Sequence, residues 1–106
     1  MNLGLVIAFA LLSVSPWARL TRDGALEVLI DASLYQTKCH GYVSPSAEAA
    51  LNRLGERFDI KLSNEVDAAK AITRMVKRSL EIEQHLTGFC AREKRAVEEF
   101  DKLGRL

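Results

Sequence analysis

The sequence lacks the short motifs by which many enzymes are recognised. Its two cysteines form neither the C-x-x-C pair of thiol redox enzymes nor the C-x-x-C-H of covalent haem attachment. The phosphate-binding P-loop, the G-x-S-x-G turn of serine hydrolases and the H-E-x-x-H of zinc proteases are also missing. No two carboxylates stand at a spacing that marks an acid–base pair. We therefore expect a protein that is not an enzyme and that has no cofactor.

An excess of charge of either sign is missing too. Lysine and arginine number 15 and aspartate and glutamate 14, so the net charge is +1. Proteins that bind nucleic acids or anionic membranes through charge need a basic excess. The composition therefore predicts no nucleic-acid partner and leaves a protein partner open.

Charged side chains are absent from residues 1–18, and all of them lie from Arg19 onward. Within this segment Leu3–Val14 is apolar, too short for the roughly 20 residues of a membrane span but typical of a secretory signal. No lysine or arginine precedes it, and Pro16 lies close to each candidate cleavage point. A buried N-terminal helix or a short membrane anchor are the alternatives. We expect a signal peptide over 1–18 and a periplasmic or secreted protein without a stable membrane span after its removal.

The remaining residues, 19–106, are predicted to form a single small α-helical domain. Apolar residues recur at three- and four-residue steps over 22–40 and again over 45–58, which predicts two helices. Ser44 followed by Pro45 is typical of a helix start, because serine caps an orphan amide and proline suits the first position. The fold class is therefore all-α.

A third apolar stripe runs over 64–103 and predicts one long helix against which the two shorter ones pack. Ser63 or Asn64 can cap its start. Gly88 could bend it, but no good cap for a new helix follows that glycine. The charged residues near its end, from Arg92 to Lys102, mix both signs and are expected to form a solvated face.

Cys39 and Cys90 are predicted to form one disulfide, as two cysteines in an exported chain most simply do. A chain of this size has a marginal core, so the cross-link would stabilise it by about 4 kcal/mol in the chain-entropy model. Two free buried thiols or a redox pair are the alternatives. A zinc site made of Cys39, His40, His85 and Cys90 is a further one, although the usual zinc spacing is absent.

No motif in the sequence indicates a function, so we expect any function to depend on the shape of the protein surface. Tyr42, in the expected turn after the first helix, is a candidate partner contact if it is exposed, because tyrosine offers rigid amphipathic area. The first hypothesis is a non-enzymatic protein-binding or structural module. The general plan, a signal before a small helical body with one long-range disulfide, is similar to that of periplasmic acid-stress chaperones of bacteria. That resemblance implies a chaperone that opens when carboxylates are protonated, and a metal or redox protein is the third hypothesis.

Export can be tested on protein expressed from the full reading frame. Removal of a signal should shorten the chain by roughly 15–25 residues, the usual length of such segments. Intact-mass spectrometry of the periplasmic or secreted fraction measures the loss. A full-length mass in the soluble cytosolic fraction would contradict the prediction.

Overall fold

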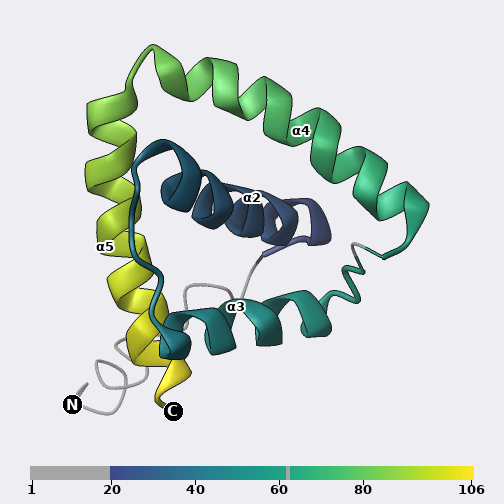
Figure 1. Cartoon of the computed structure of the whole chain (residues 1–106). Helices are drawn as coiled ribbons and strands as arrows, with labels where there is room; N and C mark the ends of the chain where they lie inside the picture. The colour runs from purple at the N-terminus through teal and green to yellow at the C-terminus, as the bar shows by residue number, and fades with distance from the viewer. Residues whose placement is uncertain (1–19, 62) are drawn as a thin grey trace, which may run out of the picture.

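The computed structural model describes residues 20–61 and 63–106, and the expected signal segment at 1–18 lies outside them. These residues form four α-helices and no strand, which confirms the all-α fold class (Figure 1). None of the helices in the described ranges has both the length and the apolar content that crossing a bilayer requires. The helices are α2 (Arg22–Lys38), α3 (Pro45–Arg57), α4 (Glu65–Glu83) and α5 (Leu86–Gly104).

Three of the helices begin at side-chain caps that the sequence indicates. The Thr21 hydroxyl accepts a hydrogen bond from the Gly24 amide at 3.1 Å. Ser44 accepts from the Ala47 amide at 3.1 Å. The Asn64 side chain accepts from the amide of Val66 at 2.8 Å. Each cap satisfies an amide that the first turn of a helix leaves without a partner, so these starts are encoded locally.

The central element is α2, which carries buried apolar residues on opposite sides. One side contributes Ala32 and Tyr35 to a core cluster with α3 and α5, completed by Ala47, Ala50, Leu51, Val97 and Phe100. The other side contributes Leu26, Ile30 and Leu34 to a second cluster with α4 and α5, completed by Ala71, Ile82 and Phe89. A helix with apolar residues on two opposite sides must be covered on both of them. In Figure 1, α3, α4 and α5 accordingly form a frame around α2.

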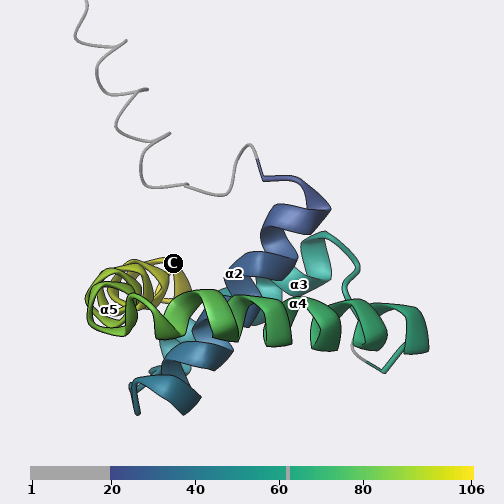
Figure 2. The same ribbon diagram turned by 90° about the horizontal axis from the view of Figure 1, so that it is seen from above.

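The predicted single helix over 64–103 is wrong, because the chain turns at Gln84 and His85 and forms α4 and α5 separately. His85 has φ −139° and ψ 38°, outside the helical region, and makes no side-chain cap hydrogen bond. Gly88, the expected bend, lies inside the first turn of α5. The turn lets α4 cross α2 (Figure 2), while α5 continues past α2 to α3 (Figure 1). Both core clusters are thereby filled. A straight helix of about 60 Å could not cover both sides of α2.

A close approach joins the end of α5 to the start of α3. A β-carbon built on Gly104 would lie 1.6 Å from the backbone carbonyl oxygen of Ser46, so only glycine allows this contact. Nearby, the Arg53 guanidinium donates to the carbonyl oxygen of Leu103 at 2.9 Å. These contacts fix α5 against α3 and thereby position the surface described below.

The Cys39–Cys90 disulfide is present and joins residues 51 positions apart in sequence. It links the end of α2 to the first half of α5, and Cys39 packs against both core clusters. The bond therefore holds α2 and α5 together at the point where the two clusters meet.

Removal of this bond should destabilise the fold without creating a new steric conflict. We expect the double substitution Cys39→Ala with Cys90→Ala to lower the free energy of unfolding by about 4 kcal/mol, as chain entropy predicts for a loop of this length. Urea unfolding followed by circular dichroism measures the difference. Reduction of the unaltered protein should give a similar loss, whereas equal stability of the two forms would contradict the prediction.

Candidate functional site

The loop between α2 and α3 projects Tyr42, a residue that is 75% exposed. The predicted first helix ends two residues early, at Lys38 rather than residue 40. The left-handed residue that turns the chain is His40, with φ 54°, and not the glycine that follows it. Gly41 is needed for space instead, because a β-carbon there would lie 2.2 Å from the ring of Tyr35. The exposure on which the Tyr42 prediction depended is thus present, and its contact with a partner stays a prediction.

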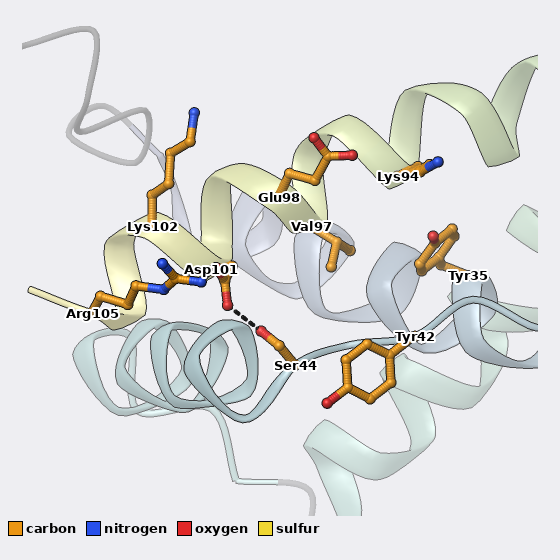
Figure 3. A pocket seen from close by; sticks show the side chains of 9 residues that line it. All are labelled: Tyr35, Tyr42, Ser44, Lys94, Val97, Glu98, Asp101, Lys102 and Arg105. Carbon is orange, nitrogen blue, oxygen red and sulfur yellow. Dashed lines mark hydrogen bonds and ion pairs between the residues drawn. The ribbon is translucent and has the colours of Figure 1, made fainter.

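A surface groove of about 590 Å³ lies between this loop and the outer side of α5 (Figure 3). We call it the Tyr42 groove. Val97 and the two tyrosines supply its apolar surface, and charged side chains of α5 surround them. Its described lining residues are Tyr35, Tyr42, Ser44, Lys94, Val97, Glu98, Asp101, Lys102 and Arg105.

The loop beside the groove is held at both ends. At one end Cys39 is bonded to Cys90 of α5. At the other end the Ser44 hydroxyl donates a hydrogen bond to the Asp101 carboxylate while it accepts from the Ala47 amide. Both anchors lead to α5, which is also the wall of the groove, so Tyr42 is placed on a short and fixed connection. Such preorganisation lowers the entropic cost of binding.

Some charged side chains around the groove are paired with a neighbouring side chain and others are not. Asp101 is paired with Arg105 at 2.6 Å in addition to its bond from Ser44, and Lys102 is paired with Glu99 at 3.2 Å. Within the described residues no ion pair engages Lys94 or Glu98. The groove therefore offers one cation and one carboxylate, a helical turn apart, to an incoming ligand.

Away from the groove, three charged side chains meet between α2, α4 and α5. The Arg78 guanidinium binds the Asp31 carboxylate through two hydrogen bonds of 2.9 and 3.1 Å and stacks over the Phe89 ring at 5.8 Å. Glu93 of α5 lies beside this pair and is only 8% exposed. Burial raises the pKa of the Glu93 carboxyl to about 7, the negative charge of Asp31 adds to the increase and Arg78 opposes it. The expectation that Glu93 belongs to a solvated face is therefore wrong.

The four residues considered for zinc do not form a ligand set. The sulfur atoms of Cys39 and Cys90 are bonded to each other, so neither is a thiolate. Residues 20–61 and 63–106 contain no group of three or more histidine, cysteine, aspartate or glutamate side chains close enough to hold a metal ion. His40 is the turn residue after α2 and His85 precedes α5.

Sequence reasoning found Tyr42 but missed the rest of the groove. Lys94, Glu98 and Asp101 were assigned to a solvated helix face, and only packing shows that this face adjoins the loop. Glu93 did leave a signal in the sequence, because it lies four residues after Phe89 and four before Val97, in the apolar stripe itself.

Comparison of the chain with models of protein families, with curated proteins and with solved structures found no match.

The burial of Glu93 makes stability depend on pH. Because the folded-state pKa is raised, the contribution of the protonated carboxyl is fully present below pH 4.5 and is lost as the pH rises through about 7. Glu93→Gln should therefore raise the free energy of unfolding at pH 8 by about 1–3 kcal/mol and leave it nearly unchanged at pH 5. Urea titrations at the two pH values measure the effect. Glu98→Gln, at an exposed position of the same helix, is the matched control, and equal effects of Glu93→Gln at both pH values would contradict the prediction.

Proposed function

We propose that the chain is a small exported helical module that binds a protein partner without catalysing a reaction, and that the Tyr42 groove is its contact surface. The observation that carries the proposal is an exposed tyrosine on a loop held at both ends, beside a groove with an apolar floor. Tyrosine is enriched at the energetically dominant positions of protein interfaces. The disulfide supports an oxidising compartment such as the periplasm or the cell exterior.

The shape and chemistry of the groove favour a short protein segment as its ligand. Its volume is in the range of ligand sites, but it opens widely along α5 (Figure 3). An apolar side chain of the partner would rest on Val97 between the two tyrosines. Lys94 and Glu98 would then pair with a carboxylate and a cation of the same segment. Ser44 is already engaged by Asp101 and by the α3 cap, so it serves the architecture of the groove.

A second candidate, the acid-stress chaperone, is favoured by one observation. The Asp67 carboxylate accepts a hydrogen bond from the Lys61 amide at 3.0 Å and another from Arg22 at 2.9 Å. These bonds hold the pKa of Asp67 below its usual value, so the stability they provide is present above pH about 4 and is lost as the pH falls further. Acid would thus release the start of α4 from α2. Glu93 acts in the opposite direction above pH 4.5, so opening in mild acid is disfavoured.

The binding function can be tested by photocrosslinking in the native host. A photoreactive amino acid at position 42 should yield a discrete adduct with a partner, whereas the same probe at Glu48, on the exposed side of α3, should not. Lys94→Glu should reduce the yield from position 42, because it removes the unpaired cation of the groove. Lys70→Glu on α4 is the matched charge control and should leave it unchanged.

Equal yields from positions 42 and 48 would show that Tyr42 has no specific partner and would contradict the binding function. Protection of a client protein from aggregation that begins only below pH about 4, together with loss of near-UV circular dichroism, would favour the chaperone instead.

A further inference from the structure

A second surface hollow, of about 570 Å³, lies where α3 ends, between α2 and the turn that follows α3. We call it the Gly55 hollow. Its apolar surface comes from three aliphatic side chains, one on each of these parts of the chain: Leu29, Leu51 and Ile60. Its volume is in the range of small-molecule sites. None of its lining residues belongs to the Tyr42 groove, so the two sites are separate.

The turn that closes α3 is a Schellman motif with an unusual choice of residues. The Ile60 amide donates to the carbonyl oxygen of Gly55 at 2.9 Å, and the Asp59 amide donates to that of Glu56 at 3.1 Å. Such a motif commonly has glycine at its left-handed residue and an apolar side chain at the residue whose carbonyl accepts the first of these bonds. Here the left-handed residue is Asp59, with φ 51°, and the glycine stands at the position of the apolar side chain.

Close packing does not impose a glycine at position 55. The nearest atom that a β-carbon there would meet is a methyl carbon of Leu29 at 3.8 Å, an ordinary van der Waals distance, whereas at Gly104 it would meet backbone at 1.6 Å. Gly55 has no positive φ that would require glycine either. Glycine inside a helix lowers stability relative to alanine. What the missing side chain provides is depth in the hollow, since Gly55 and Leu29 both line it.

The charges around the hollow leave one carboxylate without a counter-charge. Asp59 is paired with Lys61 at 3.5 Å. Arg22, which donates to the carbonyl oxygen of Asp59, is paired with Asp67 at 2.9 Å. Glu56 lines the hollow, and no ion pair within the described residues engages it. The net charge that faces a ligand is therefore negative.

The other cations of α3 do not answer this charge. Arg53 donates to the carbonyl oxygen of Leu103, Arg57 lies over the Phe58 ring at 5.3 Å, and neither lines the hollow.

The end of α3 adds two features that suit a cation. The C-terminal end of a helix carries the negative end of its dipole, which stabilises positive charge. Asn52, one helical turn before Glu56, also lines the hollow, and its side-chain amide makes no hydrogen bond within the part of the chain that the structure describes. An ammonium group at this edge can donate to the Glu56 carboxylate and to the Asn52 amide oxygen. An anion would instead have to separate Lys61 from Asp59.

We propose that the Gly55 hollow binds a small amphiphilic amine, whose apolar body rests on the three aliphatic side chains and whose ammonium group is bound by Glu56 and Asn52. Burial of the apolar body provides the affinity, and the carboxylate selects the charge of the ligand. The site does not depend on the function proposed for the Tyr42 groove.

The test compares three probes with the same six-carbon chain: hexylamine, hexan-1-ol and hexanoate. Each is titrated at pH 7 and low salt into the protein with its disulfide intact, and backbone amide shifts in two-dimensional NMR report affinity and location. Hexylamine should bind about fivefold more tightly than hexan-1-ol, as one partly exposed ion pair predicts, and hexanoate should bind most weakly. The largest shifts should fall on the residues that line the hollow.

Two variants separate the charge from the space. Glu56→Gln should remove the advantage of hexylamine over hexan-1-ol, whereas Glu48→Gln, the same change at an exposed position of α3, should leave it unchanged. Gly55→Ala should weaken both probes by about threefold, because the methyl group takes up apolar contact area in the hollow. The same variant should raise the midpoint of thermal unfolding by about 4 °C, because alanine suits a helix better. Binding and stability should thus change in opposite directions.

Several results would overturn the proposal. Equal affinity for the three probes, or affinity for none, would show that Glu56 selects no ligand. Preference for hexanoate would assign recognition to Lys61. Unchanged binding by the Gly55→Ala variant would show that the glycine serves no ligand. Amide shifts around the hollow that depend on protein concentration without any probe would identify a second copy of the chain as the occupant.

Discussion

The burial of α2 determines where the other helices lie. Its apolar residues point in two opposite directions, into a cluster with α3 and α5 and into another with α4 and α5. No single neighbouring helix can cover both sides. The chain after residue 64 must therefore supply two helices with different directions, and it does so by turning at Gln84 and His85. The stretch 64–103, which the sequence predicted as one long helix, therefore forms two helices, because both sides of α2 have to be covered.

The disulfide joins α2 to α5 next to the loop that borders the Tyr42 groove. Cys39 closes α2 and at the same time begins the loop that carries Tyr42, while Cys90 belongs to the helix that forms the opposite wall of the groove. The Ser44–Asp101 hydrogen bond ties the other end of the same loop to the same helix. The stability of the fold and the shape of the candidate site thus depend on the same two connections. In a small domain with a marginal core, few other contacts could fix the loop.

Charged groups between the helices respond to pH in opposite ways. Asp67 joins α4 to the start of α2 and to the Lys61 backbone, and this contribution is lost in acid. Glu93 is buried beside the Asp31–Arg78 pair and is most compatible with the fold when it is protonated. The two effects leave a window of mildly acidic pH in which neither carboxyl opposes folding.

The sequence by itself determined what depends on neighbouring residues. The caps at Thr21, Ser44 and Asn64 set helix starts through local hydrogen bonds, and apolar periodicity predicted helices and no strand. The pairing of Cys39 with Cys90 was also predicted from the sequence, whereas the exposure of Tyr42 was a condition that only the structure could meet.

Only the tertiary structure decided the turn between α4 and α5. This turn has no side-chain cap and no glycine at the break. It forms because α2 must be covered on both sides. The position of the α5 charges beside the Tyr42 loop has the same origin. So does the division of the apolar residues of α4 into a covered and an open face, because periodicity shows that a helix has an apolar side but not how much of it the other helices can reach.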